Sequence, residues 1–267
     1  LLDWGCCAVI SDIAPLGIEA ARVAGLPSVL IENFTWDWIY RGYADCYPEM
    51  TEHADYLTSI YAAADLHLQC QPACRPTLGA IPTTPVSREN REDPEMVRER
   101  LGLQRGRKFV LITMGGTPHD LPFLQALGHR WSDVDFVIAG QTELPSLPEN
   151  VQRLSSESFL HHPDLVRAAD AVIGKVGYST IAEVYRAGVP FGYFAPPGNP
   201  EMPALLAFLN THIQGIHFEA NAYANGIWLD QLPDLLAMKK VDRSGEIYGA
   251  DQCAASIVSL VDKTTQR

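Results

Sequence analysis

One segment in the second half of the chain has the residue types of an anion-binding turn. Residues 174–183 read Gly-Lys-Val-Gly-Tyr-Ser-Thr-Ile-Ala-Glu, between an apolar run and a helical pattern. Glycines let backbone N–H groups approach a ligand closely, and the positive end of the following helix attracts phosphate. Ser179 and Thr180 fall where that helix should begin, so their hydroxyls either bind phosphate or cap the helix. Lys175 adds a positive charge that a simple cap does not need.

The same spacing leaves two interpretations for Glu183. It follows Thr180 by three residues, as the acidic member of a capping box does. The other interpretation is that its carboxylate faces a ligand. The segment is not a Walker A loop, because Ala169 stands where the first glycine should be and Val176 follows the lysine.

A second glycine turn lies earlier, where Gly115, Gly116 and Thr117 follow a strand pattern at 108–114 and precede a helix from about residue 121. Two strand-to-helix turns in one parallel sheet open on the same edge, which is where ligands of such sheets bind. The two turns together predict a diphosphate site.

Strand and helix patterns alternate along the chain, which predicts an α/β fold with parallel sheets. The expected strands are 9–11, 28–31, 66–68, 108–114, 134–139, 151–154, 171–173 and 191–194. The expected helices are 14–24, 48–64, 94–101, 162–169, 180–187, 203–210 and 253–261, with another from about 121. Prolines and Ser/Thr residues between 72 and 91 predict a linker. We therefore expect two Rossmann-like domains, 1–90 and 91–267. The chain enters its first strand almost at once, so we expect the first domain to be incomplete.

Composition excludes several classes of function. The net charge of -12 argues against a broad nucleic-acid-binding surface, which needs Lys and Arg. No run of 18 apolar residues occurs, so we expect no transmembrane segment and a cytoplasmic protein. The six cysteines fit neither a zinc pattern nor a small disulfide framework, although a disulfide or metal role for Cys70 and Cys74 stays open.

The second half of the chain resembles the donor-site signature of GT-B glycosyltransferases. Residues 164–180 read Asp-Leu-Val-Arg-Ala-Ala-Asp-Ala-Val-Ile-Gly-Lys-Val-Gly-Tyr-Ser-Thr, and Glu183, Gly188 and Pro190 follow. This is similar to the peptidoglycan N-acetylglucosaminyltransferases and to plant and antibiotic glucosyltransferases. Segments 11–15 and 33–40 resemble more specifically a bacterial glycosyltransferase-like group related to the N-terminal region of L-arabinokinases. The resemblance covers nearly the whole chain.

The resemblance implies sugar transfer from a nucleotide diphosphate, first a UDP-sugar, to an unknown acceptor, with inversion and without a metal or other cofactor. It places the following residues in the donor pocket: Gly115, Gly116, Thr117, Phe159, Lys175, Gly177, Tyr178, Ser179, Thr180, Glu183 and Glu201. Glu183 would accept hydrogen bonds from the ribose, while the 177–180 turn would hold the diphosphate. Lys175 would neutralise phosphate in place of a metal. Phe159 would lie against the base, or else in the core, and Glu201 near the donor sugar.

The implied catalytic residue is Asp12, just past the first strand. In plant-type members an Asp at this place orients the catalytic His, as carboxylates do in triads. That His belongs to a loop that we expect ahead of Leu1. Asp12 is equally well explained as the N-cap of the helix from about residue 14. His161 and His162 fringe the expected base pocket, and Trp36, Trp38 and Tyr40 line an acceptor groove or belong to the core.

Two alternatives remain beside a transferase. Segment 194–201 contains no Arg, whereas the related group has one there, which favours a non-catalytic module that binds nucleotide-sugars. The other alternative is a UDP-sugar epimerase of the same fold, which would need its own acidic residues in the cleft.

Overall fold

The computed structural model describes residues 1–114, 121–140, 146–154 and 160–265 of the chain. It contains a four-stranded and a six-stranded parallel sheet, each covered by helices. The chain divides into two compact units. The first comprises Leu1–Val86, Asn199–Leu205 and Ile247–Arg267, and the second comprises Ser87–Gly198 and Leu206–Glu246. The predicted α/β class with two parallel sheets is confirmed, and the N-terminal sheet is the smaller of the two.

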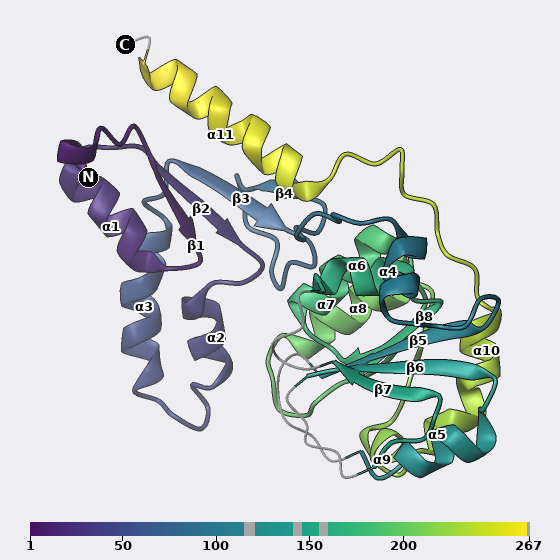
Figure 1. The fold of residues 1–267 in the computed structure, drawn as a ribbon. Coiled ribbons are helices and arrows are strands. Elements are labelled where there is room, and N and C mark those ends of the chain that lie inside the picture. Colours follow the sequence, from purple (N-terminus) through teal and green to yellow (C-terminus); the bar gives the residue numbers. More distant parts are fainter. Residues whose placement is uncertain (115–120, 141–145, 155–159, 266–267) are drawn as a thin grey trace. The chain divides into compact units, whose positions relative to one another are not determined.

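The sheet of the first unit has the order β1-β2-β3-β4 (Figure 1). Its strands are Val9–Asp12, Ser28–Glu32, Leu66–Cys70 and Ile81–Thr83, and its helices are η1 Leu2–Trp4, α1 Pro15–Ala24, α2 Trp36–Gly42, α3 Met50–Tyr61 and α11 Gly249–Thr265. Successive side chains of β2 point to opposite faces. Leu30 packs with Ile18 of α1 and Ile60 of α3, whereas Val29 packs with Cys253 of α11. Both faces of this sheet are therefore buried by helices.

Two features of this unit differ from the expected organisation. The segment at 72–91 that was expected to be a linker contains β4, which pairs with β3 at the edge of the sheet. Its central residue is Pro82, which an edge strand tolerates because no neighbour needs its N–H. Helix α11 packs against β3 and β4, whereas the division at residue 90 assigned it to the second domain. Helix α2 was not expected at all.

The sheet of the second unit has the order β10-β9-β8-β5-β6-β7. Its strands in chain order are β5 Lys108–Thr113, β6 Val134–Ala139, β7 Val151–Leu154, β8 Ala171–Lys175, β9 Phe191–Phe194 and β10 Gly215–His217. The helices are α4 Pro94–Arg100, α5 Leu124–Arg130, α6 His162–Ala168, α7 Tyr178–Ala187, α9 Ala220–Ala224, η2 Ile227–Gln231 and α10 Leu232–Ala237, while α8 Met202–His212 runs through both units. In Figure 1, α4, α6 and α7 lie on one face of the sheet, with α5, α9 and α10 on the other. That second face holds a large hydrophobic core around Phe136 and Trp228.

Helix α7 begins two residues before the expected start. Its N-cap is Gly177, which makes no side-chain cap bond, and it ends at Gly188 in the left-handed conformation at φ 63°. Such a glycine is a common helix terminator. One further glycine of the motif has a packing role, because a Cβ on Gly174 would lie 2.2 Å from the Thr113 carbonyl oxygen. Gly174 therefore lets β8 lie close beside β5.

None of the helices that the structure describes has the length and apolar character needed to cross a bilayer.

Candidate functional site

One group of polar residues in the second unit lies at the carboxyl edge of its sheet. Strand β5 ends at Thr113, β8 ends at Lys175, and α6 begins at His162. All the strand pairs of this sheet are parallel, so their carboxyl ends share one edge. Helix α7 starts directly after β8 and brings Glu183 to the same place.

Glu183 is the centre of this group. Its side chain is only 4% exposed, and both carboxylate oxygens have partners. Arg88 Nη2 donates to Oε1 over 3.1 Å, and His162 Nδ1 lies 2.5 Å from Oε2. A buried carboxylate needs such donors, because a buried charge left without compensation is strongly destabilising. The arrangement thus holds one negative charge at the sheet edge.

The imidazole of His162 is held on both sides. Its Nε2 lies 3.1 Å from Thr113 Oγ1 at the end of β5, and Thr113 is buried. The direction of this hydrogen bond depends on the protonation of the ring, because a hydroxyl can both donate and accept. The chain Thr113–His162–Glu183 therefore fixes the ring and, through it, the carboxylate.

The environment keeps Glu183 ionised. Burial raises the pKa of this carboxyl, but the hydrogen bond and charge of His162, followed by those of Arg88, lower it further than burial raises it. The net result is a pKa below the ordinary value of 4.5. A carboxylate that stays charged at neutral pH can accept hydrogen bonds from two hydroxyl groups of a ligand.

The capping-box interpretation of Glu183 is wrong in this structure. Thr180 lies inside α7, whose N-cap is Gly177, so no capping box can start at Thr180. The Glu183 carboxylate instead binds Arg88 and His162. Of the two motif hydroxyls, Ser179 is exposed to solvent and Thr180 is buried.

Other predicted donor-pocket residues divide between the two parts of the chain. Lys175, Gly177 and Tyr178 are half-buried at the end of β8 and the start of α7. Glu201 belongs to the first unit. Gly115, Gly116, Thr117 and Phe159 lie outside the described residues, so their roles stay predictions.

Sequence reasoning missed two members of the Glu183 group. Arg88 lies in the segment expected to be a linker, 95 positions from its partner, and no local pattern connects the two. Thr113 occupies the last position of an apolar strand, where a single polar residue carries little signal. His162 was expected only to fringe the base pocket, and its pairing with Glu183 was not foreseen.

Asp12 lies exposed at the carboxyl end of β1. Its interpretation as a helix cap has no support, because the N-cap of α1 is Ala14 and no side chain caps this helix. The next residue, Ile13, has φ 56°, which is a strained backbone for a β-branched side chain. The strain is held by hydrogen bonds from Ile13 N to Ile31 O and from the Tyr61 hydroxyl to Ile13 O. Strained residues held in this way concentrate at functional sites.

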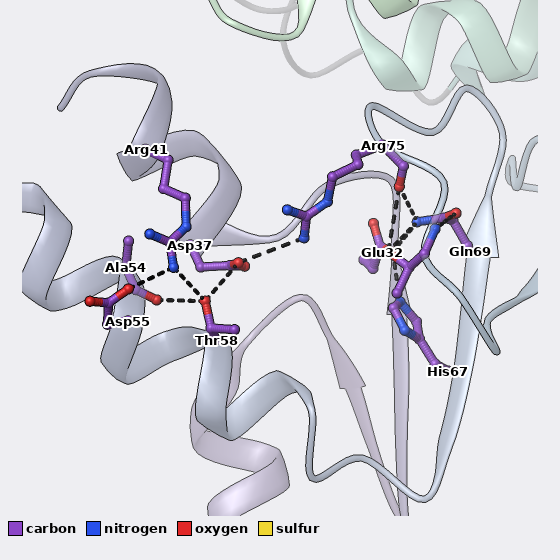
Figure 2. A network of polar contacts seen from close by, with 10 residues as sticks. Glu32, Asp37, Arg41, Ala54, Asp55, Thr58, His67, Gln69 and Arg75 are labelled. Atoms are coloured by element: carbon purple, nitrogen blue, oxygen red, sulfur yellow. Dashed lines mark hydrogen bonds and ion pairs between the residues drawn. The ribbon is translucent and has the colours of Figure 1, made fainter. Parts of the chain in front are cut away.

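The first unit has a polar cluster of its own (Figure 2). Glu32, at the end of β2, accepts a hydrogen bond from Gln69 Nε2 over 2.8 Å and lies 2.7 Å from His67 Nε2. Gln69 also donates to the backbone oxygen of Arg75, which ties the loop after β3 to the sheet. The Arg75 guanidinium in turn lies 3.7 Å from the buried carboxylate of Asp37. The cluster joins β2, β3, α2 and this loop.

Beside α2 lies a pocket of about 480 Å³ with mostly aromatic walls. It is lined by Phe34, Trp36, Ile39, Tyr40, Tyr43, Tyr47, Met50 and Glu201, all of the first unit. Trp36 is 37% exposed, so Trp36 and Tyr40 belong to a pocket wall rather than to the core. Trp38 does not line it.

The described residues contain no group of three or more His, Cys, Asp or Glu side chains that could hold a metal ion. Cys70 and Cys74 form no disulfide in this structure.

Comparison with solved structures identifies the fold. The glycosyltransferase SnogD from Streptomyces nogalater superposes with a TM-score of 0.62, covering 97% of this chain and 74% of that one at 17% identity. The glycosyltransferase VinC in complex with dTDP gives 0.59, covering 88% and 65% at 17% identity. The rhamnosyltransferase SpnG, complexed with spinosyn aglycone, gives 0.58, covering 99% and 71% at 17% identity.

This chain has the GT-B glycosyltransferase fold. Among curated proteins, L-arabinokinase of Arabidopsis thaliana is 26% identical over 246 residues, which are 89% of this chain. The match spans only 23% of the kinase's length. No family model matches the sequence. The resemblance to GT-B enzymes with an L-arabinokinase relation, expected from the sequence, is confirmed at the level of fold.

Proposed function

We propose that this GT-B chain binds a nucleotide-sugar at the carboxyl edge of its second sheet, with a UDP-sugar as the favoured donor. It then transfers the sugar with inversion to an acceptor hydroxyl. The single observation that carries the proposal is Glu183, a buried carboxylate held ionised at that edge. Glu183 occupies the position of the acidic residue in the GT-B donor-site signature. In that signature the acidic residue accepts hydrogen bonds from the ribose hydroxyls. VinC, a structure of the same fold, was solved with dTDP.

The turn before α7 supports a phosphate beside Glu183. Gly177 has φ -170°, which any residue adopts, and a Cβ there would meet no atom within 4 Å. The described part of the fold therefore does not itself require glycine at this position, whereas a phosphate packed on the backbone would. Lys175 and the start of α7 supply positive potential for the leaving diphosphate. On this basis we propose transfer without a metal ion or other cofactor.

The reaction would join the acceptor oxygen to the anomeric carbon as the bond from that carbon to the diphosphate breaks. The acceptor proton would pass to a general base. Asp12, exposed beside the strained Ile13, is the proposed residue that orients this base. Asp12→Asn should lower kcat far more than it lowers donor affinity, because an orienting carboxylate acts on the charge formed in the transition state. Unchanged turnover in this variant would remove Asp12 from the mechanism.

The aromatic pocket of the first unit is the proposed acceptor site. Trp36, Tyr40 and Tyr43 offer apolar faces, and Glu201 offers an acceptor for a hydroxyl. SpnG, which shares the fold, was solved with an aglycone. The acceptor and the expected cytoplasmic location stay predictions.

Thermal unfolding with nucleotides tests the donor assignment. UDP or a UDP-sugar at millimolar concentration should raise the Tm, since a ligand that binds only the native state stabilises it by mass action. Absence of a shift with UDP, dTDP and GDP alike would overturn the proposal.

A second candidate function is nucleotide-sugar binding without transfer, favoured by the absence of Arg between residues 194 and 201. Product analysis separates the candidates. A transferase releases UDP in step with glycosylated acceptor, and the non-catalytic module binds UDP without turnover. An epimerase of this fold would convert the UDP-sugar with no acceptor present.

A further inference from the structure

As it stands, the Glu183 carboxylate is closed to a ligand. It is 4% exposed, with Arg88 on one oxygen and His162 on the other. A hydroxyl that approaches from solvent cannot reach it past both covers. One of the two side chains must therefore move when a ligand binds Glu183.

The side chains of Arg88 and His162, which shield Glu183 from solvent, differ in how many partners hold them. His162 is 27% exposed and has a second bond, to the buried Thr113. Arg88 is 62% exposed, and within the described residues its guanidinium binds Glu183 alone. A mostly exposed guanidinium with one described partner exchanges with solvent more readily than an imidazole bonded on both sides. Arg88 is thus the cover that a ligand displaces.

The backbone that carries Arg88 is nevertheless fixed. It belongs to a segment, Ser87–Arg91, that we call the strap. Asn90 Nδ2 donates to the backbone oxygen of Pro163 over 2.8 Å, and Arg91 N donates to Asp164 Oδ1 over 2.7 Å. Asp164 is only 2% exposed. Both anchors are on α6, so a displaced Arg88 side chain stays beside the site.

We propose that Arg88 exchanges partners on ligand binding, leaving Glu183 for the ribose hydroxyls and then binding the diphosphate of the same nucleotide. This inference rests on the proposed function. A guanidinium is a planar fork that binds phosphate oxygens in pairs. In the ligand-free state Glu183 holds the fork at the site. Arg88 therefore selects nucleoside diphosphates over nucleosides, a discrimination that Glu183 alone cannot make.

Calorimetric titration with UDP and with uridine tests the exchange, using the wild type, Arg88→Ala and Arg88→Lys. In Arg88→Ala, the Kd for UDP should rise about tenfold, the size of one lost charge-assisted contact. The Kd for uridine should stay the same or fall, because the cover on Glu183 is gone. Arg88→Lys should recover part of the UDP affinity, since it keeps the charge without the fork.

Arg91→Ala is the matched control, because it removes another strap guanidinium while its backbone bond to Asp164 is retained. This variant should leave the preference for UDP over uridine unchanged. An equal change for both ligands in Arg88→Ala would overturn the exchange and leave Arg88 only a partner of Glu183. Unchanged binding of both would overturn it as well. A wild type that binds no nucleotide would instead overturn the proposed function on which the inference rests.

Discussion

Within the part of the chain that the structure describes, each unit contains a close pair of a glutamate and a histidine side chain, and the two pairs have different surroundings. Glu32 and His67 lie 2.7 Å apart with side chains 1% and 17% exposed. Glu183 and His162 lie 2.5 Å apart with side chains 4% and 27% exposed. The chemistry and the burial are nearly the same. The second partner of each carboxylate is what differs.

In the first unit that partner is Gln69, a neutral amide on the neighbouring strand that also holds the loop after β3. It cannot leave without disturbing the sheet (Figure 2). In the second unit the partner is Arg88, a mostly exposed side chain on the strap. A buried carboxylate whose partners are strand-borne joins parts of the fold, whereas one with a removable partner can accept a ligand. The accessibility of the second donor therefore separates a structural pair from a candidate binding pair.

The largest expected effect is on the stability of the first unit. Glu32→Ala should lower the free energy of unfolding by about 3 kcal/mol, because it leaves Gln69 and His67 as buried donors without their acceptor. Chemical denaturation measures this loss. Glu32→Gln keeps the shape and should cost less. UDP affinity should be unchanged in either folded variant, and a clear loss of affinity would contradict the structural assignment of this pair.

The next largest effect is on ligand binding in the second unit. Glu183→Gln should weaken UDP binding about tenfold or more, since a charged acceptor for two hydroxyls becomes a neutral one. Titration calorimetry measures the change. Asp135→Asn is the matched control. Asp135 is a buried carboxylate paired with Arg107, and it lies near the amino end of β6, at the sheet edge opposite to Glu183. It should leave UDP affinity as it is. Comparable losses in both variants would show only a damaged fold.

A smaller effect is expected from the residue behind His162. Thr113→Val removes the hydroxyl bond to Nε2 at nearly constant volume and should weaken UDP binding about threefold, the cost of one ordinary hydrogen bond. The same titration applies. A loss as large as that of Glu183→Gln would mean that Thr113 itself contacts the ligand. Unchanged affinity would mean that Glu183 alone suffices to hold the imidazole.

The smallest effect concerns pH. The folded-state pKa of Glu183 lies below its ordinary value of 4.5, so its contribution to stability is fully present above that value. It is lost as pH falls through the lowered folded-state pKa, because the unfolded chain then binds the extra proton first. Wild-type stability should therefore fall more steeply with acid than that of Glu183→Gln. Parallel curves for the two proteins in denaturation between about pH 6 and 3 would contradict the ionised assignment.

Much of the fold could be predicted because several strands are largely apolar and alternate with helical patterns. Strands β6, β7 and β9 have the expected bounds, and β2 and β8 end only one or two residues later than expected. Strand β4 was missed because three residues around Pro82 resemble a linker when read alone. Its pairing partner on β3 decides that it is a strand, and such pairing is a property of the folded chain.

The candidate site divides along the same line. Glu183 and the 174–180 turn are local motifs, so the sequence was sufficient to nominate them. The contacts of Glu183 with Arg88 and His162 cross 95 and 21 positions. The sequence analysis did not select Glu32 as a site residue. Its partners become apparent only when β2 and β3 pair and place Glu32 opposite Gln69. Long-range pairing, and not residue type, separates these two glutamates.

Helix α11 has a consequence for the order in which the protein folds. Its 17 residues, at 249–265, cover the face of the first sheet that Val29 and Cys70 present. During synthesis this face stays uncovered until the second unit has left the ribosome, because α11 follows that unit in the sequence. Contacts that join distant positions form slowly, and a bare apolar sheet is prone to aggregate while it waits. The sheet of the first unit precedes the second unit in the sequence but receives this helix only after it, so chaperone demand should concentrate on the nascent first sheet.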